Sequence, residues 1–263
     1  MLDCHTHVFR PPVAARLCAM IGEEFNCRPE GNGTPEDLLA HLDAARCTYA
    51  ICLSAALTPG QMIPANNWAI DLHKHSSRLL PFGTVHPDHP SWEKELDRLT
   101  EHGIRGLKLH PDLCGIPLDD PRWHPIWEAA SNRFLILTHM GPSQKGTTTA
   151  SPPRALAKVL TEFPKLSVIA AHFGGMFQWE ESLELLAGRN VFFDTSCSLH
   201  VMPLHMLQAF CTKHDQHRIL FGSDYPLFSP SNAYASLSQA LQQTNLSQKQ
   251  LAINAQHLLR TLL

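Results

Sequence analysis

The stretch LDCHTH at residues 2–7 places two histidines, His5 and His7, on either side of a single threonine. Side chains at positions i and i+2 of a β-strand point to the same side. On a strand, both imidazoles would therefore face one point and could hold one metal ion. Because H-x-H also occurs in strands that bind nothing, the stretch alone leaves open a metal site or the polar start of a buried strand.

Seven other segments share the apolar and β-branched character of this one and show little alternation of polar and apolar residues. That composition is typical of parallel strands that are covered on both faces. The eight predicted strands are residues 2–7, 50–54, 80–85, 106–110, 134–139, 167–172, 191–196 and 219–223.

Helical patterns separate these strands. Thr34 and Pro35 have the character of a helix cap and a first helical residue. Amphipathic stripes predict further helices, and the predicted segments are residues 34–45, 155–163, 180–187 and 251–262, with weaker patterns over 64–77, 90–102, 121–131 and 201–213.

The alternation of strands and helices predicts an α/β fold, a single (β/α)₈ barrel of the TIM type over residues 1–263. A doubly wound open sheet is the alternative, but it favours a Gly-rich turn after an early strand, and this sequence has none. The longest irregular stretch, residues 8–33, is expected to be a functional loop or lid.

The composition indicates a folded enzyme-sized chain without affinity for nucleic acid or membranes. The chain has 263 residues, is 44% hydrophobic and 17% charged, and carries a net charge of −3. It shows no run of Lys or Arg, no signal-peptide pattern and no apolar stretch of membrane-spanning length. Its 8 cysteines include no C-x-x-C pair, so we expect reduced thiols and a cytoplasmic location.

Residues that can bind a metal stand at the ends of several predicted strands. In a barrel these ends open on one face, where the active sites of this fold lie. His139 and Asp224 could therefore complete the coordination of an ion held by His5 and His7, leaving a position for water. Imidazole and carboxylate ligands favour Zn²⁺, with Fe, Mn and Co as alternatives. Each residue alone could be structural, but the joint pattern favours a metal site.

Several motifs together resemble the amidohydrolase superfamily, and more narrowly the amidohydrolase-related family that includes aminocarboxymuconate semialdehyde decarboxylase. The resemblance extends over almost the whole chain. The motifs are DCHTHV at 3–8, LPFGTVHP at 80–87, GIRGLKLHP at 103–111, LTHMG at 137–141, AHFGG at 171–175 and LFGSDYP at 220–226.

The resemblance implies a barrel that binds a divalent metal, usually zinc. It makes His5, His7, His139 and Asp224 the metal ligands, and His172 the catalytic histidine that orients or deprotonates the metal-activated water. Asp224 would also take a proton from that water and pass it to the leaving group. On the first strand, we expect Leu2 and Cys4 on the barrel-wall side and Asp3 as a support of the site.

Lys108 raises the question of metal count. In binuclear members of the superfamily a carboxylated lysine on the fourth strand bridges two metals, and both His139 and His172 would then serve the second ion. Alternatively, an uncarboxylated Lys108 binds a carboxylate of the substrate. In a purely structural role, Lys108 would form an ion pair with Asp194. Family analogy favours one Zn²⁺, with two if Lys108 is carboxylated.

Two reactions of a small-molecule substrate fit these residues. The first is hydrolysis of an ester, lactone or amide, and it depends on Asp224 beside the H-x-H pair. The alternative is non-oxidative decarboxylation of a small unsaturated or aromatic acid, with Lys108, Arg10 or Arg28 binding the carboxylate. A barrel that has lost catalysis would show gaps in the ligand set, and the sequence shows none. Nothing in the sequence specifies whether the chain forms a homo-oligomer.

Overall fold

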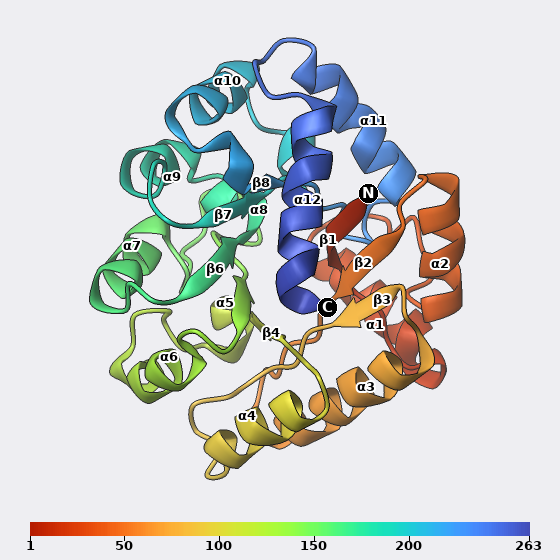
Figure 1. Ribbon diagram of the computed structural model, residues 1–263, viewed down its shortest axis with the longest axis vertical. Coiled ribbons are helices and arrows are strands. Elements are labelled where there is room, and N and C mark those ends of the chain that lie inside the picture. The colour runs from red at the N-terminus through yellow and green to blue at the C-terminus, as the bar shows by residue number, and fades with distance from the viewer.

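Eight parallel β-strands form the centre of the protein, as a computed structural model that describes residues 1–263 shows (Figure 1). All eight predicted strands are present, most of them shorter than the apolar run that predicted them. They are β1 (Leu2–Thr6), β2 (Tyr49–Cys52), β3 (Leu79–Pro81), β4 (Gly106–Leu109), β5 (Leu135–Thr138), β6 (Ser167–Ala170), β7 (Phe192–Asp194) and β8 (Ile219–Leu220).

The strands pair in sequence order as two sheets, β1-β2-β3 and β4-β5-β6-β7-β8. An isolated parallel bridge joins Gly83 to Leu107 at the seam between β3 and β4, where the Lys108 amide also donates to the Gly83 carbonyl at 2.8 Å. A second bridge joins Thr6 to Tyr225 at the seam between β8 and β1. Hydrogen bonds thus run around the whole ring, and the predicted (β/α)₈ barrel is confirmed.

Helices cover this ring, most of them on its outside (Figure 1). They are α1 (Pro11–Glu24), α2 (Pro35–Ala44), α3 (Met62–His75), α4 (Trp92–Glu101), α5 (Pro111–Cys114), α6 (His124–Ala130), α7 (Pro153–Glu162), α8 (Ala171–Gly174), α9 (Trp179–Leu185), α10 (Leu204–Lys213), α11 (Pro230–Leu241) and α12 (Gln248–Leu262), with 3₁₀ turns η1 (Pro59–Gln61), η2 (Pro121–Trp123), η3 (Ser198–His200) and η4 (Gln216–Arg218). The predicted cap of α2 is confirmed, because the Thr34 hydroxyl accepts the Asp37 amide at 3.2 Å. No helix combines the length and the apolar character that crossing a membrane requires.

The prediction of a long loop at residues 8–33 is wrong in its first half, where α1 forms. The buried residues of α1 are Ala14, Cys18 and Gly22, which recur every fourth position but are small. A stripe of small residues lacks the strong apolar signal by which helices are found in a sequence. Helix α11 was not predicted either, although Ser229 caps it by accepting the Asn232 amide.

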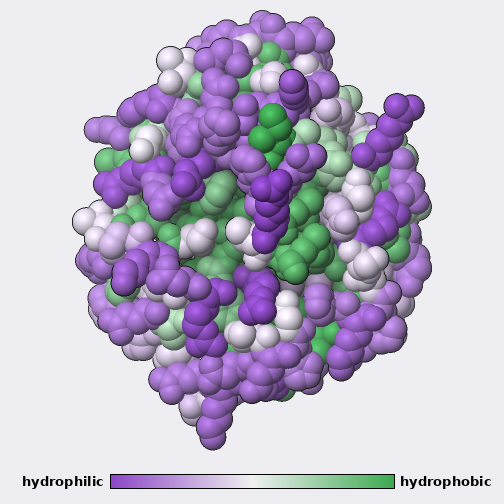
Figure 2. Space-filling view, viewed as in Figure 1, coloured by the Kyte–Doolittle hydropathy of each residue, from purple (hydrophilic) through white to green (hydrophobic).

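Two apolar clusters form the core. The larger cluster has 51 buried residues, drawn mainly from the outer faces of the strands and the helices that cover them. The smaller cluster fills the interior of the barrel and includes Leu2, Cys4, Ile51, Leu53, Leu80, Phe82, Leu135, Leu137, Ile169, Ala171, Leu220, Ala255 and Leu258. Its last two members belong to α12, which crosses in front of the strands in Figure 1. Figure 2 shows that this face is largely hydrophilic, with apolar side chains gathered near its centre.

This packing corrects the expectation for the first strand, because Leu2 and Cys4 face the barrel interior. The pairing of β1 with β2 shifts between Asp3 and Thr6, as at a β-bulge or a similar irregularity. Such an irregularity interrupts the alternation of side chains, so Cys4 and the next residue, His5, can both reach the inside. Asp3 Oδ1 accepts the amide of Ser223 at 2.9 Å and so ties β1 to the end of β8.

His214 links the outer layer of helices to the sheet. It caps α10, its ring lies 4.5 Å from that of Phe193 on β7, and its Nδ1 accepts the Gly188 amide at 3.1 Å. Burial lowers the pKa of His214 to about 4 from an ordinary value of 6.5. Between those two pH values the unfolded chain binds a proton that the folded chain does not. The contribution of His214 to stability is therefore complete above pH 6.5 and is lost as the pH falls toward 4.

The variant His214→Asn tests this dependence, since the amide oxygen of asparagine can replace Nδ1 as the acceptor for Gly188. We expect the wild-type chain to lose about 1–3 kcal/mol more unfolding free energy than the variant between pH 7 and pH 4. Urea denaturation at four pH values across this range measures the difference. His75→Asn, at the exposed end of α3, is the control and should leave the wild-type slope unchanged. Parallel curves for His214→Asn and the wild type would contradict the assignment.

Candidate metal centre

Five of the residues that the sequence singled out lie at or just beyond the carboxyl ends of strands. His5 is on β1 and His7 follows it, His139 follows β5, His172 is in the tight turn α8 after β6, and Asp224 follows β8. His172 and Asp224 have φ values of 59° and 66°, in the left-handed region that non-glycine residues rarely adopt. These sharp turns bring the side chains over the barrel mouth, where contacts link all five.

The H-x-H pair faces one oxygen of Asp224. His5 Nδ1 lies 2.9 Å from Asp194 Oδ2, and His7 Nδ1 lies 3.2 Å from the carbonyl oxygen of Leu53. Because both partners are acceptors, each Nδ1 carries the hydrogen and each Nε2 presents a lone pair. The Nε2 atoms of His5 and His7 lie 3.4 and 3.3 Å from Asp224 Oδ1. Three lone pairs thus converge on one point.

His139 presents a fourth lone pair. His172 Nδ1 lies 3.1 Å from the carbonyl oxygen of Ser196, so it donates there and its Nε2 is an acceptor. His139 Nδ1 lies 3.2 Å from that Nε2 and therefore donates to it. The remaining nitrogen, His139 Nε2, is buried and has no hydrogen-bond partner in the protein. His5, His7 and Asp224 thus direct three acceptors at one point, with the Lys108 ammonium as a nearby donor, 3.4 Å from His5 Nε2. His139 lies at metal-binding distance from His110 and Asp112 rather than from these three. Imidazoles held by such second hydrogen bonds are typical of metal ligands.

The electrostatics of the site favour the same protonation states. Burial, helped by the charge of Lys108, lowers the pKa of His5 to about 4. Burial and two neighbouring imidazoles hold the pKa of His139 well below its ordinary value. Burial opposes ionisation of Asp224, but His5 and the other imidazoles outweigh it and hold the pKa of this carboxyl well below its usual range. Neutral imidazoles beside an ionised carboxylate are the forms that bind a metal.

Asp194 on β7 connects the two halves of the site. Its Oδ2 accepts from His5 Nδ1, and its Oδ1 accepts the backbone amides of His172 and Ser196, each at 3.0 Å. The Ser196 hydroxyl also donates to Oδ1 and lies 2.9 Å from His172 Nδ1. The sequence suggested Asp194 only as an ion-pair partner for Lys108. The residues around Asp194 in the sequence do not show that its carboxylate accepts hydrogen bonds from residues of other strands.

Lys108 on β4 is fully buried below this cluster, and its Nζ lies 3.4 Å from His5 Nε2. No carboxylate oxygen lies within ion-pair distance of Nζ, so the alternative of an ion pair with Asp194 is wrong. Burial lowers the pKa of Lys108 to about 8. An amine in this state can serve as a cation for a substrate or, once neutral, react with CO₂ to form a carbamate.

The structure offers two groups of side chains at metal-binding distances. One consists of His5, His172 and Asp224, and the other of His110, Asp112 and His139, with ligand atoms within 4.8 Å of one another in each. Asp112 was not singled out in the sequence. Its two oxygens are occupied, one by the Ala150 amide at 2.8 Å and one by the Ser151 hydroxyl at 2.5 Å. The first group, whose Asp224 oxygen faces the histidines, therefore suits a cation better.

Helix α1 borders the mouth of the site. Phe25, which caps its end, has its ring 6.1 Å from that of His139. The stretch 8–33 thus reaches the site, as a helix with a short following turn. Arg10 lies over the ring of Trp68 at 5.8 Å, and neither it nor Arg28 makes an ion pair with a site residue. Binding of a substrate carboxylate by either arginine stays a prediction.

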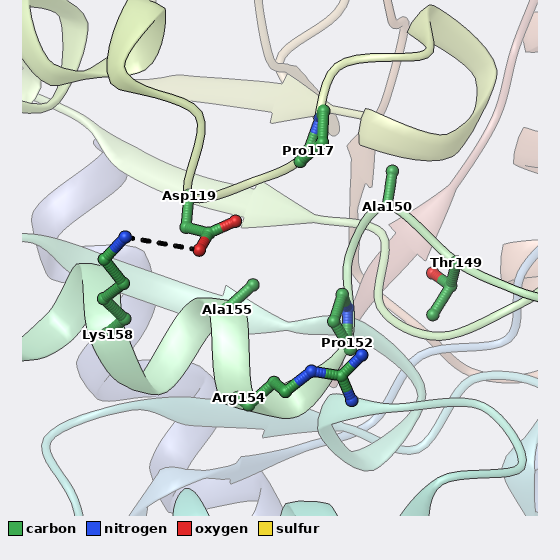
Figure 3. Close-up of a pocket in the computed structure, with 8 residues that line it drawn as sticks. All are labelled: Pro117, Asp119, Thr149, Ala150, Pro152, Arg154, Ala155 and Lys158. Carbon is green, nitrogen blue, oxygen red and sulfur yellow. Dashed lines mark hydrogen bonds and ion pairs between the residues drawn. The ribbon is translucent and has the colours of Figure 1, made fainter.

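A separate cavity of about 440 Å³ lies on the outside of the barrel (Figure 3). It is bordered by Pro117 and Asp119 on one side and by the start of α7 on the other. Asp119 pairs with Lys158 at 3.4 Å across it. None of the five residues of the candidate centre lines this cavity.

Comparison with known proteins agrees with the fold. Among solved structures, an uncharacterised TIM-barrel protein from Bordetella bronchiseptica is similar with a TM-score of 0.75 and 17% identity, over 99% of each chain. The 5-carboxyvanillate decarboxylase of Sphingomonas paucimobilis has a TM-score of 0.68 and 16% identity, over 99% of this chain and 98% of the other. A Pseudomonas putida protein that has been proposed to be a 2-pyrone-4,6-dicarboxylic acid hydrolase has a TM-score of 0.62 and 18% identity, over 95% of each chain. No curated protein matches the sequence.

At these identities the solved structures support the fold alone, whereas the sequence itself identifies the family. The family model described as amidohydrolase matches residues 2–260. That match includes every strand of the barrel and all five residues of the candidate centre. The chain therefore belongs to the amidohydrolase family.

Proposed function

We propose that this chain is a metal-dependent hydrolase that cleaves an ester, lactone or amide bond in a small molecule. The observation that carries the proposal is the position of Asp224, whose Oδ1 lies 3.3–3.4 Å from the Nε2 atoms of His7 and His5. A carboxylate in this place can hold a metal and also accept a proton from a water molecule beside it. Decarboxylation needs no base that acts on water.

The proposed ligands are His5, His7, His139 and Asp224, and the ion they fit best is a single Zn²⁺. When bound, the cation would polarise the scissile carbonyl and make a neighbouring water more acidic. The protein supplies the rest of the chemistry. Asp194 and the Leu53 carbonyl orient the two imidazoles of the H-x-H pair, so that little reorganisation accompanies the reaction.

Asp224 and His172 handle the protons in this proposal. Asp224 takes a proton from the attacking water at a carboxylate oxygen and returns it to the leaving group. His172 donates its Nδ1 hydrogen to the Ser196 carbonyl, so its Nε2 is an acceptor. This Nε2 accepts the Nδ1 hydrogen of His139 in the structure, and in the reaction it would exchange that hydrogen for one of the attacking water. The Ser196 hydroxyl, itself bonded to Asp194, holds the His172 ring in this tautomer.

Non-oxidative decarboxylation of a small unsaturated or aromatic acid is the second candidate, and Lys108 is the observation that favours it. Its ammonium is buried and lies against His5 Nε2, but it is not neutralised by a carboxylate of the protein. A carboxylate on the substrate would satisfy that charge. One of the solved structures with a similar fold is a decarboxylase, which is consistent with this second candidate.

Replacement of His172 separates its catalytic role from a ligand role. We expect His172→Asn to lower kcat by about 10²- to 10⁴-fold, because the acceptor that orients the water is lost. The variant should retain the metal content of the wild type, measured by mass spectrometry of the purified protein. Asp224→Asn should lose both turnover and metal.

His205→Asn, on the exposed side of α10, is the matched control and should change neither quantity. Loss of the metal in His172→Asn would contradict the proposed role and place His172 among the ligands, as its grouping with His5 and Asp224 allows. Two metal equivalents per chain in the wild type would contradict the single-ion site.

Turnover in H₂¹⁸O distinguishes the two reactions. We expect ¹⁸O in the acid product when the enzyme is tested on a panel of small lactones, esters, amides and hydroxybenzoic acids, because hydrolysis incorporates solvent oxygen. Release of CO₂ from an acid, without incorporation of ¹⁸O into the remaining product, would contradict hydrolysis and support the second candidate. Lys108→Met serves as the control, since it should abolish the decarboxylation and only weaken the binding of a neutral ester.

A further inference from the structure

Cys197 contacts the side of Asp224 that faces away from the histidines. Its Sγ lies 2.8 Å from Asp224 Oδ2, while Oδ1 of the same carboxylate faces the Nε2 atoms of His5 and His7. The two oxygens of Asp224 therefore have different surroundings. One faces a thiol, and the other faces the proposed metal position.

This contact is unlike the other thiol contacts in the chain. The thiols of Cys27, Cys47, Cys52 and Cys114 donate to backbone carbonyls near them in the sequence. Only the thiol of Cys197 donates to a charged side chain, and that side chain is 27 positions away on the next strand end. A hydrogen bond to an ionised acceptor is stronger than one between neutral groups.

The backbone at Cys197 is turned to make the contact. Its φ and ψ are 54° and −24°, in the left-handed region, although the residue has a Cβ. Glycine adopts this conformation without strain, whereas cysteine does so at a cost in stability. The preceding residues are fixed, because Asp194 Oδ1 accepts the amide and the hydroxyl of Ser196. The turn thus places a thiol where glycine would be the less strained residue.

The direction of the hydrogen bond follows from the charges. The Asp224 carboxylate is an acceptor, and a thiolate beside it would be repelled, so the thiol is the donor. A donor on Oδ2 restricts rotation of the carboxylate about its bond to Cβ. That restriction keeps Oδ1 aimed at His5 and His7.

We propose that Cys197 is a positioning residue that fixes the Asp224 carboxylate and so increases the affinity of the centre for its cation. The proposal rests on the proposed metal-dependent function and names a further residue of the same site. It gives Cys197 no contact with the cation. Thiol chemistry and metal ligation by sulfur are therefore not part of its role.

Metal affinity of the wild type and of three Cys197 variants tests the proposal. Co²⁺ is the probe, and a chromophoric chelator is the competitor. We expect Cys197→Ala and Cys197→Gly to bind Co²⁺ about 10-fold more weakly than the wild type, the usual size of a second-sphere loss. Cys197→Ser should stay within about 3-fold of the wild type, because its hydroxyl can donate to the same oxygen.

Thermal melting of the chelated proteins separates positioning from a structural role. Cys197→Gly relieves the left-handed strain, so its Tm should equal or exceed that of the wild type by about 1–3 °C while its affinity for Co²⁺ falls. Asn132→Gly is the matched control, since Asn132 also has a positive φ, 59°, but lies far from the site at the end of α6. It should raise the Tm and leave Co²⁺ affinity unchanged.

Three results would overturn the role of Cys197 alone. They are wild-type affinity in Cys197→Ala and Cys197→Gly, a parallel fall of Tm and affinity in Cys197→Gly, and an intense sulfur-to-cobalt charge-transfer band that Cys197→Ser removes. The last result would make Cys197 a ligand. Failure of the wild-type chain to bind Co²⁺ at all would instead overturn the proposed metal-dependent function, and this proposal with it.

Discussion

Lone pairs of the H-x-H histidines and of Asp224 converge at the mouth of the barrel. His5 and His7 each direct a lone pair at Asp224 Oδ1, because their other ring nitrogens donate to Asp194 and to the Leu53 carbonyl. Acceptors packed together without donors destabilise a fold unless a cation or a proton lies between them. In this protein the Lys108 ammonium, 3.4 Å from His5 Nε2, offsets part of this cost, which is largest for the buried His5 and Asp224. The divalent cation that we propose would resolve the conflict and would account for the residue types.

The barrel maintains this geometry through contacts between strands that are distant in sequence. Asp194 on β7 holds His5 of β1 and the turn that carries His172 after β6. The irregularity in β1 lets Cys4 fill the interior while His5 reaches the mouth. Left-handed backbone at Asp224, among other positions at the strand ends, stores strain that the surrounding packing offsets. Support and strain thus concentrate at the carboxyl ends of the strands, the face where this fold carries its chemistry.

Local patterns were enough to predict the eight strands, most of the helices and the residues that gather at the mouth, because apolar runs and the H-x-H spacing are visible in short windows of sequence. Features that depend on distant contacts were missed or mistaken. Helix α1 buries Ala14, Cys18 and Gly22, which give no apolar stripe. The irregularity that lets His5 reach the mouth beside Cys4 depends on the pairing of β1 with β2. The contact of Cys197 with a carboxylate on the following strand leaves no mark in the sequence around it.

We propose that His5, His7, His139 and Asp224 together hold one divalent cation. A crystal structure with anomalous diffraction data collected on both sides of the metal absorption edge tests it most directly. We expect one anomalous peak at the barrel mouth, within coordination distance of the Nε2 atoms of all three histidines and of an Asp224 oxygen. A peak held instead by His110 and Asp112, or a second peak bridged to the first by a carboxylated lysine, would contradict it.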